Sequence, residues 1–490
     1  MLFNSYNFLI FFPIVVGITF LIPKKWQYIW LLIASYYFYM NWDARYVLLL
    51  FFSTAITYLS GLAISYVRAH DNNIVKKKWI VAISFIVNLS ILFSFKYFNF
   101  TMEIINSLFN HFHMELVLPR VNVLLPVGIS FYIFQALSYT VDIYRGDIEA
   151  EHNFLRYALF VSFFPQLVAG PIERSKNLLK QINETHSFQF ENMRNGLLLM
   201  LWGYFLKIVI ADRTAILVDT VYGDIQQYSG IYVMIATVLF AIQIYCDFAG
   251  YSTIAIGAAE IMGFHLMENF NCPYFATSIK DFWHRWHISL STWFRDYLYI
   301  PLGGNKKGKK RKYINTLIVF SVSGLWHGAA MTYVIWGFLH GIYQVIGDIA
   351  RPASNRISSH LNKYLAKTIS IVVTFILVDF AWIFFRANNV EDAMHVILSM
   401  CHFSNLNWMK DGTLFELGLN SANIKVLLVS IFILFIADIA KYNGIEVRKL
   451  ITKLILPARW ICYLVAVFYI LIFGIWGASY DASSFIYFQF

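Results

Sequence analysis

Two histidines stand in some of the most apolar and aromatic surroundings of the sequence. His287 lies in FWHRWHISLSTWFRDYLYI, and His327 lies in SGLWHGAA. An ionisable side chain among apolar residues is costly, so in a membrane protein it indicates a functional site. A desolvated imidazole also favours its neutral form, which is the form that a general base needs. The two histidines are therefore the first candidates for catalysis.

Each histidine also has a purely structural interpretation. Small residues surround His327, and in a membrane helix such residues let neighbouring backbones approach closely, with the histidine hydrogen-bonded across the contact. On a continuous helix, Trp283, Leu290 and Phe294 would share the face of the other histidine. That pattern is equally typical of an amphipathic helix at the membrane surface, with Trp and Tyr as interface anchors.

A strongly basic run, KKGKKRK at 306–312, separates the two histidine segments. Six cations around a glycine cannot enter a bilayer, so the positive-inside rule predicts a solvated cytoplasmic loop. His287 lies 16 residues before Gly303, and His327 lies 15 residues after the basic run. If both arms were helices leaving one membrane face, a rise of ~1.5 Å per residue would place both imidazoles ~22 to 24 Å along them. The histidines are therefore predicted to meet, unless the turn PLGG at 301–304 ends the first arm early.

Polar side chains in two other apolar runs have several interpretations. Asp247, in IYCDFAGYSTIAIG, could orient an imidazole or accept structural hydrogen bonds. It could also pair with Arg285 or Arg295. Lys207 and Asp212, in LWGYFLKIVIADR, are interpreted as residues that snorkel at a helix end.

No metal site is expected from the sequence. His284 and His287 are three residues apart and could share a metal ion, but no cysteine or carboxylate stands at a spacing that completes a site. The four cysteines lie far apart with no CxxC pair. We interpret them as small apolar core residues.

The composition predicts an all-α, polytopic membrane protein. Of 490 residues, 59% are hydrophobic, 19% aromatic and only 13% charged. Soluble domains are roughly 45 to 50% apolar and about 25% charged. The basic residues behind the net charge of +10 gather in short loops between apolar runs, which is a topology signal and not a nucleic-acid surface.

The apolar runs predict about eleven crossings at ~20 residues each, with additional re-entrant and short helices. The run at 229–263 is too long for one simple crossing. In FLRYALFVSFFPQLVAGPIER, Pro165, Gly170 and Pro171 interrupt an apolar run, which predicts a broken or re-entrant helix. Basic clusters on alternate loops predict a retained first span with the N-terminus outside.

We expect a single multi-spanning membrane domain over 1–490. Its predicted parts are N-terminal helices at 1–120, a catalytic core at 121–349 and C-terminal helices at 350–490.

The stretches WHRWHISLSTWFRDYLYIPLGGN and SGLWHGAAMTYVIWGFLHG resemble the membrane-bound O-acyltransferase family (MBOAT), in particular its alginate O-acetyltransferase branch. Further motifs that carry the resemblance are LLPVGISFYIFQALSYTVDIYRG, FFPQLVAGPIER, LWGYFLKIVIADR, IYCDFAGYSTIAIG, FAWIFFRA and the C-terminal FIYFQF. Together these motifs cover most of the chain in the order of the family.

The resemblance implies roles for individual residues. The catalytic histidine of the W-H-G context corresponds to His327, and the histidine of R-W-H-x-S corresponds to His287. The signature RDYLYIPLGGN separates this branch from the D-alanyl-transferring and lipid-modifying branches. Thr253 stands where the family pattern has Asp after the serine, so no catalytic carboxylate is assigned there. Substrate contacts are expected from Trp326, Trp286, Arg285, Arg295, Asp296, Tyr299, Asp247 and Gln166.

The resemblance also implies an architecture and a reaction. A ring of helices would surround a central tunnel that is open to a cytoplasmic acyl donor on one face and to an acceptor on the other. The expected donor is acetyl-CoA, with no tightly bound cofactor. Expected partners are membrane lipid, an extracytoplasmic esterase-like protein of SGNH type and a polysaccharide acceptor, at the cytoplasmic (inner) membrane of a bacterium. The alternative is a transporter or flippase in which buried histidines relay protons.

Overall fold

The computed structural model describes residues 1–114, 118–121, 125–168, 170–402, 412–476 and 486. These residues form helices and turns and contain no strand, which confirms the predicted all-α class. The chain folds as two compact units, Met1–Leu197 with Ala255–Met267, and Leu198–Ile254 with Glu268–Phe490. Two of the three boundaries fall inside helices, α10 and α12, and the third falls between Met267 and Glu268, after the end of α12. The three-part division predicted from the sequence stays a prediction.

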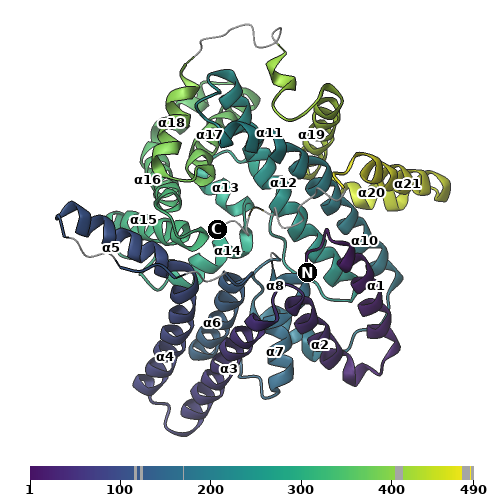
Figure 1. Cartoon of the computed structure of the whole chain (residues 1–490). Coiled ribbons are helices and arrows are strands. Elements are labelled where there is room, and N and C mark those ends of the chain that lie inside the picture. The colour runs from purple at the N-terminus through teal and green to yellow at the C-terminus, as the bar shows by residue number, and fades with distance from the viewer. Residues whose placement is uncertain (115–117, 122–124, 169, 403–411, 477–485, 487–490) are drawn as a thin grey trace. The chain divides into compact units, whose positions relative to one another are not determined.

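The first unit contains the N-terminal helices. Within it, α3 packs against α4, α6 and α7, and α2 packs against α7 (Figure 1). Its helices are α1 (Tyr6–Leu21), α2 (Gln27–Met40), α3 (Val47–His70), α4 (Ile74–Leu92), α5 (Phe98–His111), α6 (Ile129–Arg145), α7 (Phe154–Ser162), α8 (Phe164–Leu167), α9 (Ser175–Asn183), the start of α10 (Phe190–Tyr204) and the end of α12 (Ile231–Ile261).

The second unit contains the histidine segments. Within it, α15 packs along α16, α16 along α17, and α13 against α16 (Figure 1). Besides the remaining parts of α10 and α12, its helices are α11 (Asp212–Gly223), α13 (Ile279–Arg285), α14 (Ile288–Phe294), α15 (Gly308–His327), α16 (Met331–Ser359), α17 (Lys363–Arg386), α18 (Val390–Met400), α19 (Ser421–Tyr442), α20 (Val447–Lys453) and α21 (Leu456–Phe473).

Three π-helical turns interrupt the α-helical pattern. They are η3 (Phe93–Tyr97), η4 (Phe205–Ala211) and η6 (Arg295–Tyr299). π-helical turns are rare in proteins, and those that occur often lie at functional sites. Two of the three contain or adjoin residues that the sequence singles out, since η4 holds Lys207 and η6 holds Arg295 and Asp296.

Seven helical segments among the described residues are long and apolar enough to cross a membrane. The prediction of a multi-pass membrane protein is therefore confirmed. α1 is also apolar but has only 16 residues. The predicted eleven crossings, their orientation and the central tunnel stay predictions. The seven segments are Ala44–His70, Ile74–His111, Phe190–Gly223, Ile231–Ile261, Lys363–Arg386, Ser421–Tyr442 and Leu456–Phe473.

The broken helix predicted around Pro165 is present. α7 ends at Ser162, α8 covers only the four residues Phe164–Leu167, and α9 begins at Ser175. Proline lies at the first turn of α8, where its missing N–H is tolerated. The side chains of α8 are all buried, as irregular backbone at membrane depth requires.

The long run at 229–263 forms one uninterrupted helix. α12 has 31 residues, which at ~1.5 Å per residue is longer than a hydrocarbon core of ~30 Å. Within the second unit it approaches α10 closely, because a Cβ added at Gly203 would lie 2.6 Å from the main-chain oxygen of Gly250.

Glycines allow α15 and α16 to pack backbone against backbone. A Cβ added at Gly324 would overlap the main-chain oxygen of Tyr333, and a Cβ added at Gly337 would overlap that of Phe320. The small residues before His327 thus form the predicted packing face. This contact determines where the end of α15, and with it His327, lies.

We therefore predict that Gly337→Ala destabilises the protein. The added methyl group has to push α15 away from α16, and overpacking of this kind costs about 1–3 kcal/mol or more. Gly347 provides a matched control on the same helix, since nothing lies within 4 Å of a Cβ added there. Thermal unfolding in detergent should show a lower melting temperature for Gly337→Ala only. Equal melting temperatures for both variants would contradict the close packing.

Candidate active site

The segment before the basic run is not one straight helix. α13 ends at Arg285, His287 has a left-handed backbone with φ 43°, and α14 begins at Ile288. A left-handed residue cannot continue a right-handed helix. The predicted continuous helix, on which Trp283, Leu290 and Phe294 would share the face of His287, is therefore wrong. The predicted loop over the whole run 306–312 is also wrong, because α15 begins at Gly308 within it.

The two histidines nevertheless meet. The ring centroids of His287 and His327 lie 6.3 Å apart. The exposed fractions of the two side chains are 0% and 3%. His287 immediately precedes α14, and His327 is the last residue of α15. The predicted convergence is therefore confirmed, while the catalytic roles of the two residues stay predictions.

Aromatic rings surround His327. The ring centroids of Trp326 and Trp336 each lie 5.0 Å from that of His327, and the centroid of Phe385 lies 5.6 Å away. Trp326 also lies 6.1 Å from His287, so its ring adjoins both histidines. The predicted site residue Trp326 is thus part of the site geometry. Rings of this size limit the access of water to the imidazoles.

His287 contacts two residues that the sequence analysis did not single out. The ring of Phe248 on α12 packs edge to face against the imidazole, with centroids 4.6 Å apart. Nδ1 of His287 lies 3.2 Å from Oδ1 of Asn269. Asn269 is buried, with 1% of its surface exposed. The only sequence signal for it is an amide side chain between Glu268 and Phe270, 18 residues before His287.

Trp286 lies in an aromatic cluster that Trp382 connects to Trp336 beside His327. Its ring stacks on Phe282 with centroids 5.5 Å apart and lies 5.0 Å from Phe270 and 5.1 Å from Trp382. The side chain is fully buried. This packing fixes α13 against α17 and supports the backbone that leads into His287.

The two predicted arginines pair with carboxylates close to them in sequence. Arg285 binds Asp281 at 2.8 Å, and its guanidinium lies over the ring of Tyr442. Arg295 binds the adjacent Asp296 at 2.8 Å, and 56% of the Arg295 side chain is exposed. Neither arrangement matches the predicted pairing of an arginine with Asp247.

Asp247 instead pairs with a buried lysine. Nζ of Lys207 lies 2.6 Å from Oδ1 of Asp247 and 2.8 Å from Oδ1 of Asp212. The three side chains are at most 5% exposed. The snorkelling interpretation of Lys207 and Asp212 is therefore wrong, and the structural alternative for Asp247 is confirmed. Oδ2 of Asp247 also accepts the N–H of Ile486, the one described residue of the C-terminal motif FIYFQF.

The remaining predicted residues have other surroundings. Gln166 belongs to the first unit, where its amide donates to the carbonyl oxygen of Phe160 at 2.8 Å. Tyr299 ends η6 and packs near Gly304. The hydroxyl of Thr253 donates to the carbonyl oxygen of its own helix at Ala249. Within the described part of the chain, no three His, Cys, Asp or Glu side chains are placed to hold a metal ion.

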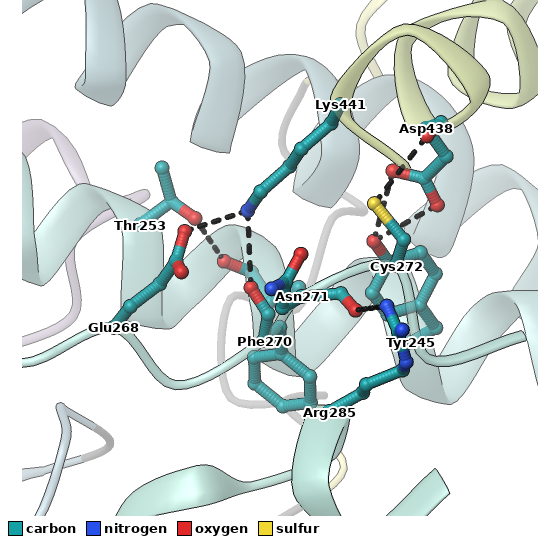
Figure 2. A network of polar contacts seen from close by, with 10 residues as sticks. Tyr245, Thr253, Glu268, Phe270, Asn271, Cys272, Arg285, Asp438 and Lys441 are labelled. Carbon is teal, nitrogen blue, oxygen red and sulfur yellow. Dashed lines mark hydrogen bonds and ion pairs between the residues drawn. The ribbon is translucent and has the colours of Figure 1, made fainter. Parts of the chain in front are cut away.

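The residues before and after Asn269 in the sequence are hydrogen-bonded to α19, as Figure 2 shows. Nζ of Lys441 donates to Glu268 at 2.6 Å and to the carbonyl oxygen of Phe270 at 3.2 Å. The thiol of Cys272 donates to the carbonyl oxygen of Asp438. Because Lys441 and Asp438 both lie on α19, this helix anchors the segment beside the site.

Comparison with known proteins agrees with these features. The model of the MBOAT, membrane-bound O-acyltransferase family matches residues 144–387. Over 428 residues the chain is 38% identical to the probable alginate O-acetylase AlgI of Pseudomonas aeruginosa, covering 84% of this chain and 79% of that protein. It is 36% identical over 447 residues to the AlgI protein of Azotobacter vinelandii, covering 90% and 85%. It is 35% identical over 419 residues to the peptidoglycan O-acetyltransferase of Helicobacter pylori, covering 78% and 76%.

The helical, multi-pass architecture is thus that of a membrane-embedded O-acyltransferase. The chain belongs to the membrane-bound O-acyltransferase family, and the similarity to alginate O-acetylases over most of its length confirms the predicted branch. Since this family consists of enzymes, the transporter alternative is not retained.

We predict that Lys207→Met destabilises the protein strongly. The variant leaves Asp212 and Asp247 buried close together without the ammonium group, and breaking a buried ion pair in this way costs about 3–5 kcal/mol. Thermal unfolding in detergent should show a large drop in melting temperature. Lys280→Met, at an exposed position, is the control and should leave the melting temperature unchanged. Wild-type stability of Lys207→Met would contradict the structural role of this ion pair.

Proposed function

We propose that the chain is an O-acetyltransferase of the bacterial cytoplasmic membrane. It takes the acetyl group of acetyl-CoA, a cytoplasmic thioester, and passes it across the membrane for O-acetylation of an extracytoplasmic polysaccharide. The observation that carries this proposal is the meeting of His287 and His327 at 6.3 Å in buried aromatic surroundings. The relatives named as alginate and peptidoglycan O-acetyltransferases support an acetyl group and a polymer acceptor.

His327 is the general base in this proposal. Its imidazole takes the proton of the acceptor hydroxyl while the hydroxyl oxygen attacks the thioester carbonyl. The new C–O bond forms, and the carbonyl oxygen becomes an oxyanion. The oxyanion then collapses, the C–S bond breaks, and the leaving thiolate takes the proton from the imidazolium. His287 either orients the acceptor hydroxyl or stabilises the oxyanion.

The aromatic surroundings have a chemical role in this reaction. A thioester in contact with water and a general base can be hydrolysed, which would waste the donor. Trp326 and Trp336 beside His327 limit the water that reaches the base, so that the acceptor hydroxyl is the favoured nucleophile. Trp326 adjoins both histidines, and we assign it to contact with the acetyl group. The other predicted substrate residues stay predictions.

The acceptor side of the proposal involves a second protein. An extracytoplasmic esterase-like protein of SGNH type would receive the acetyl group and transfer it to the polymer. This partner comes from the family resemblance, and the polymers in the names of the relatives support an acceptor outside the cytoplasm. The choice of polymer then belongs to the partner as much as to this chain.

We predict that His327→Ala abolishes acetylation of the polymer. Loss of a general base lowers the rate by about 10²–10⁴-fold, and the small side chain should leave membrane insertion intact. The acetyl content of the surface polysaccharide, measured by mass spectrometry, tests this in cells that contain equal amounts of the wild-type or variant protein. His360→Ala, at an exposed histidine, is the control. Undiminished acetyl content with His327→Ala would refute the assigned role.

The donor can be tested with the purified protein in liposomes. Offered radiolabelled acetyl-CoA and a soluble oligosaccharide, the protein should label acceptor hydroxyls and release one free CoA for each acetyl group transferred. If acetyl-CoA stays intact, while a different radiolabelled acyl thioester offered in its place labels the acceptor, the choice of donor is wrong. Movement of a whole solute across the liposome without acyl transfer would overturn the proposed activity.

A further inference from the structure

Asn269 is hydrogen-bonded to the residues that follow His287. Its carbonyl oxygen accepts the N–H of Ile288 at 3.0 Å. Its side-chain Oδ1 accepts the N–H of Ser289 at 3.2 Å and the hydroxyl of Ser289 at 2.9 Å. These bonds hold the first turn of α14 directly after the left-handed residue. The orientation of the imidazole is thereby tied to Asn269.

The hydrogen bonds also identify the side-chain atom that faces His287. A main-chain N–H can only donate, so the atom of Asn269 that faces Ser289 is the amide oxygen and not the amide nitrogen. The same oxygen lies 3.2 Å from Nδ1 of His287. A lone pair on Nδ1 would repel this oxygen, whereas a proton on Nδ1 is attracted to it. The contact therefore favours the tautomer with the proton on Nδ1.

We propose that Asn269 is a positioning residue that fixes the ring orientation and the tautomer of His287. With its proton on Nδ1, the neutral imidazole carries its lone pair on Nε2, so Nε2 accepts a hydrogen bond and does not donate one. This inference rests on the proposed function of the histidine pair and decides between its two roles for His287. With no proton on Nε2, His287 does not stabilise the oxyanion; its lone pair accepts a hydrogen bond from the acceptor molecule and orients it, while the proton of the reacting hydroxyl goes to His327.

The surroundings of Asn269 are suited to a positioning role. Lys441 binds both Glu268 and the carbonyl oxygen of Phe270, the residues on either side of Asn269 (Figure 2). The N–H of Asn271 donates to the carbonyl oxygen of Arg285 at 2.9 Å. The backbone of Asn269 is therefore fixed against both α19 and α13. A rigid support of this kind is what an oriented catalytic imidazole requires.

Two substitutions separate positioning from simple packing. Asn269→Asp keeps an oxygen facing Ser289 and Nδ1, whereas Asn269→Leu removes every polar atom of the side chain. Asn315→Leu is the control, because Asn315 is also fully buried and donates to the carbonyl oxygens of Leu302 and Gly304. All variants are first checked for a single folded species by size-exclusion chromatography in detergent.

The pH profile of acetyl transfer is the first measurement. In Asn269→Asp the carboxylate favours the imidazolium form of His287, which cannot accept a hydrogen bond on Nε2. In the pH profile of kcat, the fall in activity at acidic pH (the acidic limb) should therefore occur at higher pH than in the wild type. Activity should be retained at pH values above this limb. Asn269→Leu should lower kcat at least about tenfold and leave the KM for acetyl-CoA unchanged. Asn315→Leu should lower the melting temperature without moving the acidic limb.

The tautomer itself is the second measurement, and it does not depend on activity. Nitrogen-15 solid-state NMR of histidine-labelled protein, with the signals of His287 assigned by their loss in His287→Gln, should show the proton on Nδ1. A proton on Nε2 in the wild type would overturn the proposal, as would wild-type kcat in Asn269→Leu or an unshifted acidic limb in Asn269→Asp. Absence of any acetyl transfer by the wild type would instead overturn the proposed function, and the NMR result would still stand.

Discussion

The left-handed turn at His287 is the constraint on which the geometry of the site depends. An ordinary residue adopts this backbone conformation at a cost of roughly 1–2 kcal/mol, so other contacts have to hold it. The hydrogen bonds that Ser289 donates to Oδ1 of Asn269 do so on one side, and the ring of Phe248 packs against the imidazole on another. Without the turn, α13 would run on as a helix and carry the imidazole away from His327. Because irregular backbone in a membrane protein must be covered by protein, the turn also needs the long helices around it.

Buried polar groups connect the helices of the second unit with one another. Lys207 binds two carboxylates, and one of them, Asp247, also accepts the N–H of Ile486. Arg213 donates to the carbonyl oxygens of Val209 and Phe473 at 2.7 Å and 2.6 Å, and so connects η4 with the end of α21. A charged group in a membrane segment is costly, and these partners explain how the chain tolerates it. An ionisable residue in an apolar run of this chain is therefore not by itself a sign of a catalytic site.

Several features of the molecule could be predicted from the sequence, for clear physical reasons. The composition alone excludes a soluble domain, and Pro165 and its glycine and proline neighbours predict the broken helix. The prediction that His287 and His327 meet is correct, but it rests on a continuous helical arm through His287 and a loop over 306–312, neither of which the structure contains. The left-handed turn could not be predicted, since a histidine rarely adopts it and the bonds that hold it come from Asn269, a separate segment. The burial of Lys207 escaped prediction for the same reason, because its partner Asp247 lies on another helix.

The position of His327 at the very end of α15 has an electrostatic consequence. The aligned peptide dipoles of a helix leave a partial negative charge of roughly half an elementary charge at its carboxyl end. A neutral imidazole there gains little from this field, but an imidazolium is stabilised by about 0.3–1 kcal/mol, and by ~2 kcal/mol where burial limits screening. In the proposed reaction, the helix that places His327 would therefore also favour the ion pair that forms when this imidazole takes a proton. The backbone of α15 provides this assistance before the reaction begins.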